Sequence, residues 1–206
     1  MSDVFEELMA LSAKLNEATG QQEDDAMEDA AEEKGEENEK EEEEENDNEP
    51  INDGVEAAVK ELGVVLANTF HVYHEAHGFH WNVKGPDFSQ YHDLFGGIYE
   101  TLFGSIDGIA EWILRMGYDA PFQMSELAAL RTIGESNPAD MPAQMAAVLL
   151  DGINVLIVDA KNLFDTANNI DEQGLADFAA GLVESNQKIA WKLRASLGLQ
   201  KQVRYK

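Results

Sequence analysis

The chain has 206 residues, of which 44% are hydrophobic and 27% are charged, and its formal net charge is −27. The length allows one domain with a sizeable core and an appendage, and the composition argues against a wholly disordered, collagen-like or membrane chain. The negative charge disfavours binding to nucleic acids and favours attraction of metal cations. Because the chain contains no cysteine, any metal site must use histidine, carboxylate and water as ligands.

The first 50 residues hold 21 Asp and Glu against three Lys, a net charge of −18. We expect an amphipathic N-terminal helix over residues 1–19, where apolar residues recur at helical spacing: Val4, Phe5, Leu8, Leu11 and Leu15. Residues 20–52 are strongly acidic, with no aromatic or β-branched residue between Gln21 and Glu49, and they predict a disordered linker. Without a basic and apolar leader or a long apolar run, a soluble, cytoplasmic protein with no membrane contact is expected.

Residues 53–199 read as helix after helix, with apolar residues at steps of three and four and no strand alternation. The expected helices cover residues 55–83, 88–116, 125–133, about 142–167 and 171–198, with Pro138 and Pro142 opening the third long one and Ser125 capping the short one. The turn at Gly85-Pro86 is too short for anything but an antiparallel hairpin. The pattern predicts an all-α, ferritin-like four-helix bundle with a short helix in its long middle crossover, followed by a basic tail over residues 200–206.

All five histidines lie within 22 residues: His71, His74, His77, His80 and His92. The first four are spaced by three, so they spiral around a helix and at most two neighbours could share an ion. For His71 and His74 we favour an ordinary structural role, with each side chain paired to backbone or carboxylate groups.

Asp107 and Glu111 point to the same side of the second long helix, beside its apolar stripe. Two interpretations stay open for them, metal ligation or a salt bridge to a residue such as Arg115. His92 lies 15 residues before Asp107, which is about 22 Å along a helix that rises roughly 1.5 Å per residue. One chain therefore cannot bring the histidine and the carboxylates onto one ion.

A dimer could bring the histidine and the carboxylates together. The hairpin places His80 near His92, and a two-fold axis crossing the second helix at residues 99–100 would bring this pair to the carboxylates of a second copy. A stripe of small residues in that region indicates close backbone approach across the dimer: Gly97, Thr101, Gly104 and Gly108. A set of two His, one Asp and one Glu suits Fe(II), Zn(II) or Mn(II).

The segment 62–121 resembles the Dps family of mini-ferritins. The resemblance rests on the order and spacing of these groups: His77-Gly78-Phe79-His80-Trp81-Asn82-Val83, Gly85-Pro86, His92, Leu94-Phe95, Tyr99, Asp107-Gly108-Ile109-Ala110-Glu111 and Gly117-Tyr118-Asp119-Ala120-Pro121. It implies a hollow shell of twelve subunits, built from two-fold dimers. Such a shell would oxidise Fe(II), preferably with hydrogen peroxide rather than dioxygen, store Fe(III) as mineral and protect against oxidative damage.

By the same resemblance, His80 and His92 of one subunit would bind iron together with Asp107 and Glu111 of its partner. Trp81 would flank the site as an electron donor, although a packed core indole is an equal alternative. The family often has an acid one turn after the second histidine, where this chain has Gly96. A second iron position is therefore expected to be poorly formed.

Three acids near the start of the last helix match the region where the family lines its pores: Asp171, Glu172 and Asp177. Ordinary helix capping is the alternative explanation for these acids. It applies least to Asp177, which lies more than a turn inside the helix. Family members that bind DNA typically use a lysine-rich tail, whereas this N-terminal segment is acidic, so we expect no DNA binding. A second functional class also stays open, in which the shell is an assembly protein that docks to a protein partner through residues 1–19.

Overall fold

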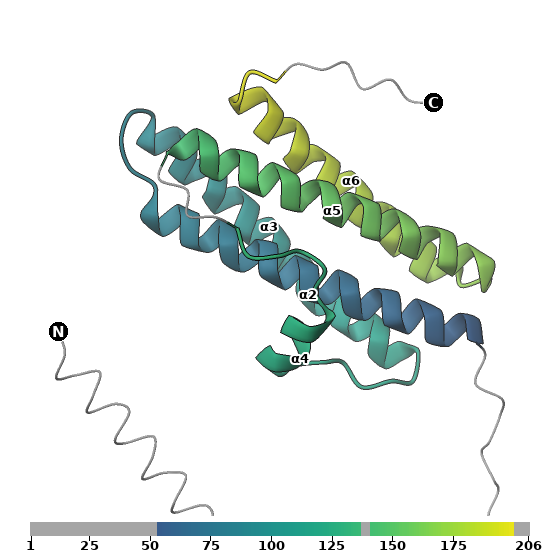
Figure 1. Cartoon of the computed structure of the whole chain (residues 1–206). Coiled ribbons are helices and arrows are strands. Elements are labelled where there is room, and N and C mark those ends of the chain that lie inside the picture. Colours follow the sequence, from purple (N-terminus) through teal and green to yellow (C-terminus); the bar gives the residue numbers. More distant parts are fainter. Residues whose placement is uncertain (1–52, 137–140, 200–206) are drawn as a thin grey trace, which may run out of the picture. The chain divides into compact units, whose positions relative to one another are not determined.

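The chain folds as a bundle of helices (Figure 1). This computed structural model describes residues 53–136 and 141–199, which form helices and no strand. The helices are α2 (Asp53–Asn82), α3 (Phe88–Arg115), α4 (Met124–Leu130), α5 (Pro142–Asn169) and α6 (Gln173–Ser196). The all-α fold class is thus confirmed. The predicted N-terminal helix at 1–19, the linker at 20–52, the tail at 200–206 and Pro138 lie outside the described residues.

Two antiparallel hairpins make up the bundle, α2 with α3 and α5 with α6, and α4 packs on α2 (Figure 1). The buried apolar residues form two clusters, one at each end. The first joins the N-terminal halves of α2 and α6 to the C-terminal halves of α3 and α5, and the second joins the opposite halves. Helices α3 and α5 therefore run in the same direction, and the connection between them must return along the bundle. This is the long crossover that the sequence predicts.

Helix α5 is long and apolar enough, by composition alone, to cross a membrane. In this bundle, 44% of its most apolar stretch is buried inside the fold. Leu149, Ile153 and Leu156 are among its buried residues, and α5 packs on both α6 and α2. The apolar character of α5 is therefore explained by its place in the core.

The start of α4 differs from the prediction. Its N-cap is Gln123, and Ser125 lies in the first turn. The carboxylate of Glu126 accepts hydrogen bonds from the backbone N–H groups of Phe122 (3.1 Å) and Gln123 (3.0 Å). A glutamate at the third helical position can satisfy the free N–H groups of a helix start, so a serine cap is not required here.

A buried asparagine fastens the crossover to the bundle. Asn68 of α2 is fully buried, and its amide donates to the Thr132 hydroxyl and to Asp159 of α5, both at 2.8 Å. Its carbonyl accepts from the backbone N–H groups of Thr132 (2.9 Å) and Ile133 (3.3 Å). One side chain thus connects α2, the crossover and α5, and it supplies the partners that buried polar groups require.

Asp159 makes the stability of this contact depend on pH. Burial raises the pKa of the Asp159 carboxyl above its ordinary value of 3.8, against the smaller opposing effect of the hydrogen bond from Asn68. A carboxyl whose pKa is raised in the folded state favours folding below its unfolded pKa, and this contribution is lost as the pH rises through the folded pKa. Once it is ionised, Asp159 therefore costs stability.

We expect the Asp159→Asn variant to lose less stability than the wild type as the pH rises from about 4 to about 7. The asparagine keeps an acceptor for the Asn68 amide but has no charge to desolvate. Thermal unfolding at fixed protein concentration across this range measures the difference. Asp151→Asn, at an exposed position on the same helix, is the matched control. Equal pH slopes for the two variants would contradict the role given to Asp159.

Candidate metal centre

The α2–α3 hairpin brings two histidines into contact. His80 lies in the last turn of α2 and His92 in the first turns of α3, and their ring centroids are 3.7 Å apart. His80 Nδ1 lies 2.8 Å from the backbone carbonyl oxygen of His92. Because a carbonyl can only accept, Nδ1 carries the hydrogen and donates it, which leaves the lone pair on His80 Nε2. A histidine held in this way is prepared to bind a metal through Nε2.

The neighbouring aromatic rings form a stacked group. His77 lies between Trp81 and Tyr99, with ring centroids 4.3 and 4.2 Å away, and the Tyr99 ring meets His80 edge-on at 5.2 Å. Trp81 is 62% exposed. The alternative of a packed core indole is therefore wrong for the single chain, and the indole stands at the surface beside the histidine pair. An electron-donating role for Trp81 stays a prediction.

The two carboxylates further along α3 are both exposed, but their surroundings differ. Glu111 Oε2 accepts a hydrogen bond from Arg115 Nη2 at 3.0 Å. The Arg115 guanidinium also lies over the Trp112 ring, 4.8 Å from its centroid. Asp107 has no hydrogen bond or ion pair to any residue that the structure describes. The salt-bridge interpretation is thus confirmed for Glu111 and not for Asp107.

The histidine pair and the carboxylate pair do not meet within one chain. His92 and the two carboxylates occupy different parts of the rigid α3 helix, and in the described ranges no group of three or more His, Asp or Glu side chains is arranged to hold a metal ion. The donor set itself fits iron, because neutral imidazole nitrogen and carboxylate oxygen are both iron ligands. Completion of the set by a second copy stays a prediction.

The small residues on α3 serve two purposes. Gly97 and Gly104 are exposed, and a Cβ added at either would meet nothing within 4 Å. A Cβ at Gly108 would instead lie 3.1 Å from the Phe178 ring of α6. The interpretation of Gly108 as a dimer contact is therefore replaced by packing inside the subunit, whereas Gly97 and Gly104 leave a bare surface on α3.

Comparison with known proteins decides the family. The Ferritin-like domain family matches residues 59–203. The chain is 30% identical to DNA protection during starvation protein 2 of Bacillus anthracis over 139 residues, which cover 68% of this chain and 95% of that protein. The chain belongs to the Dps family of mini-ferritins.

Solved Dps structures share this fold. The Vibrio cholerae O1 Dps protein, described as a member of a superfamily of ferritin-like diiron-carboxylate proteins, is 25% identical with a TM-score of 0.68, and the match covers 70% of this chain and 91% of that one. Dps from Staphylococcus aureus is 28% identical with a TM-score of 0.67, and the match covers 70% and 97% of the two chains. The bundle and its crossover are therefore those of a Dps subunit.

Gly96 is a point where this Dps chain departs from the expected site. Its Cα faces the His80 ring, and an added Cβ would lie 3.4 Å from both Cε1 and Nδ1 of that ring. A side chain at position 96 would thus begin in contact with this ring. Glycine at this position leaves space for the imidazole, and no acid is supplied from it.

The three predicted pore acids have different positions in the Dps fold. Glu172 is the N-cap of α6 and accepts a hydrogen bond from the Gly174 backbone N–H at 3.3 Å, so the capping interpretation is confirmed for it. Asp171 is exposed just before the helix, with a positive φ of 58°. Asp177 is exposed within the first turns of α6. A pore lined by these acids stays a prediction.

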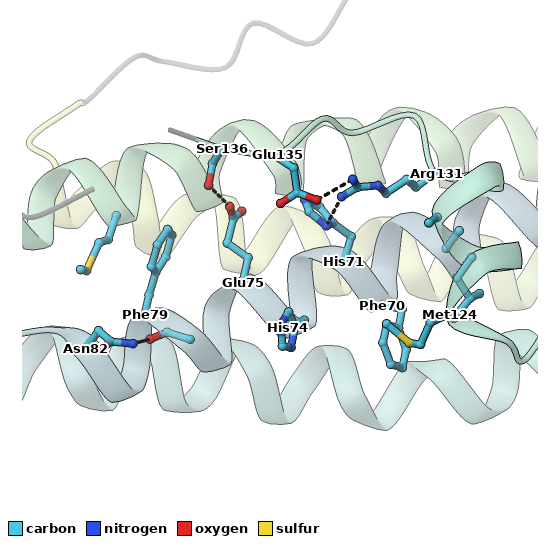
Figure 2. A pocket seen from close by; sticks show the side chains of 15 residues that line it. Phe70, His71, His74, Glu75, Phe79, Asn82, Met124, Arg131, Glu135 and Ser136 are labelled. Atoms are coloured by element: carbon cyan, nitrogen blue, oxygen red, sulfur yellow. Dashed lines mark hydrogen bonds and ion pairs between the residues drawn. The ribbon is translucent and has the colours of Figure 1, made fainter. Parts of the chain in front are cut away.

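A second polar group, missed by the sequence reasoning, lies on the other side of α2. His71, His74 and Arg131 line a cavity of about 600 Å³ between α2 and α4 (Figure 2). Arg131 donates to His71 Nδ1 at 2.8 Å and also pairs with Glu135. The hydrogen bond from Arg131 to Glu135 and the positive charge of Arg131 hold the pKa of the Glu135 carboxyl below its ordinary value. The spacing of residues within one helix could not predict this contact, because Arg131 and His71 lie 60 residues apart in the chain.

His71 has a structural contact, as expected, but its partner is the Arg131 guanidinium and not a backbone or carboxylate group. Because Arg131 can only donate, His71 Nδ1 is an acceptor and Nε2 carries the hydrogen. His71 Nε2 is buried and has no hydrogen-bond partner among the described residues. In this tautomer neither ring nitrogen has a lone pair free for a metal.

Proposed function

We propose that the chain is a ferroxidase and iron-storage protein. It would oxidise Fe(II), with hydrogen peroxide as the preferred oxidant, at sites shared between two subunits. The Fe(III) product would be stored inside a hollow shell of twelve subunits, which removes iron and peroxide together and limits oxidative damage. Membership of the Dps family and the donor set on the α2–α3 hairpin support this proposal.

One observation carries the assignment of the site. The His80 Nδ1 hydrogen bond to the His92 carbonyl fixes the tautomer that leaves Nε2 for iron. His80 and His92 therefore form the nitrogen half of the proposed site.

The carboxylates of the partner form the other half. In an antiparallel pair of α3 helices, Asp107 and Glu111 of one subunit would face His80 and His92 of the other. Carboxylate oxygen is a hard ligand that favours the higher charge of Fe(III) over Fe(II). The mixed donor set would thus bind the substrate ion and also favour its oxidation. Asp107, which has no partner in the described part of the chain, is free to act in this way.

We expect His80→Ala and Asp107→Ala each to lose rapid Fe(II) oxidation by at least about tenfold, because each removes a ligand and even the loss of a ligand's hydrogen-bond partner typically costs that much. Stopped-flow absorbance after mixing Fe(II) and peroxide with the protein measures the rate. The two variants are then refolded together. Since the ligands come from different subunits, every mixed dimer would carry one intact site, and activity should partly return.

Mass measurement of each assembly is the necessary control, since a variant that does not assemble says nothing about ligands. His74→Ala is the matched histidine control, because His74 is exposed on the opposite side of α2 near the cavity of Figure 2. Full activity in either single variant, or no recovery in the mixture of two assembled variants, would count against a shared site.

The charge of the chain argues against a DNA-binding role, although the Bacillus anthracis relative is named for DNA protection. Residues 1–50 supply −18 of the net charge of −27. An assembly of such chains would repel the phosphate backbone, and this repulsion reaches about 8 Å at physiological salt.

We therefore expect the full-length protein not to retard duplex DNA in a gel at near-physiological salt. Removal of residues 1–50 takes away most of the repulsion and leaves the basic C-terminal residues in place, so any retardation should appear first in this shortened protein. Tight binding by the full-length protein, with affinity that falls steeply as salt rises, would restore DNA protection as a function.

A further inference from the structure

Arg115 is the part of the carboxylate region that the proposed site does not use. Its guanidinium donates to Glu111 Oε2 at 3.0 Å and lies over the Trp112 ring at 4.8 Å. Trp112 is itself fixed between helices, because its ring lies 6.1 Å from the Phe178 ring and a Cβ at Gly174 would approach it to 3.1 Å. Arg115 therefore rests on a rigid support and is directed at one of the two carboxylates.

This contact competes with a metal ion for the same group. Only Oε2 of Glu111 is engaged, so a divalent ion could approach Oε1 while Arg115 stays in place. The ion and the guanidinium would then lie on either side of one carboxylate, at a distance where like charges repel appreciably even near the surface. Alternatively, Arg115 would have to leave Glu111. In both cases, the salt bridge with Arg115 lowers the affinity of Glu111 for a metal cation.

Both side chains are about half exposed, at 56% for Arg115 and 51% for Glu111. An exposed pair of this kind is weak, so a divalent ion with further ligands could displace it. Neighbouring Asp107 has no such cation among the described residues. The two carboxylates are thus different in the free subunit, one open and one occupied by an internal cation.

We propose that Arg115 is a positioning residue that acts as an internal counter-ion, holding Glu111 until a divalent ion displaces it and thereby setting the metal affinity of the site. This inference rests on the proposed function, because it takes Glu111 as a metal ligand. Arg115 would keep weakly bound cations away from the carboxylate pair and release Glu111 only to an ion that the histidines also bind.

Titration of the assembled, iron-free protein with zinc chloride tests this, since Zn(II) binds the same ligand types and undergoes no oxidation. We expect Arg115→Gln to bind Zn(II) about threefold to tenfold more tightly than the wild type, since a competing charge is gone. The gain should shrink as salt increases, because the groups are exposed. Arg115→Lys, which keeps the charge but loses the planar stack on Trp112, should fall between the two.

Two controls separate the causes. Lys161→Gln removes one positive charge at an exposed position on α5, and it corrects for the change in net charge. Arg115→Gln combined with Glu111→Gln should show no gain over Glu111→Gln alone, since the effect must pass through Glu111. Zn(II) binding by Arg115→Gln that is no tighter than that of Lys161→Gln would overturn the inference. Unchanged Zn(II) binding in His80→Ala and Asp107→Ala would instead overturn the proposed site.

Discussion

The rigid length of α3 is the constraint on which the arrangement of this protein depends. A continuous helix cannot fold back on itself, so His92 near its start and Asp107 in its second half stay about 22 Å apart. The turn between α2 and α3 brings two of the four proposed ligands together, because it places His80 of α2 against His92. The carboxylates can reach such a pair only in another copy of the chain. A shared site is therefore a direct result of helix geometry once these residues are taken as ligands.

Helix α3 meets this requirement by having two different surfaces. On one, Ile109 and Ile113 are buried, and Gly108 allows Phe178 of α6 to approach closely. On the other, Asp107 and Glu111 are exposed, and Phe103 is 63% exposed although its ring packs on Tyr73 of α2, with centroids 5.6 Å apart. The same helix can thus support the subunit core and offer a surface to a second subunit.

The sequence predicted the framework of this fold and part of the site. Helical periodicity and the Gly85-Pro86 turn gave the helices within a few residues, and from these followed the contact of His80 with His92. The contacts that it missed join residues far apart in the chain: Gly108 with Phe178, and His71 with Arg131. Spacing within a helix shows which residues share a face, but it does not show what covers that face. The exposure of Trp81 was uncertain for the same reason.

The Asn68 contact has a consequence for how the subunit folds. Its partners Thr132 and Asp159 lie 64 and 91 residues away in sequence, whereas each hairpin is held mainly by contacts between consecutive helices. Local contacts cost less loop entropy and form faster, so the two hairpins can fold before the crossover is fastened between them. A late step that orders the crossover would also order α4, which lies within it and packs on α2. We therefore expect the surface around α4 to be among the last parts of the subunit to form.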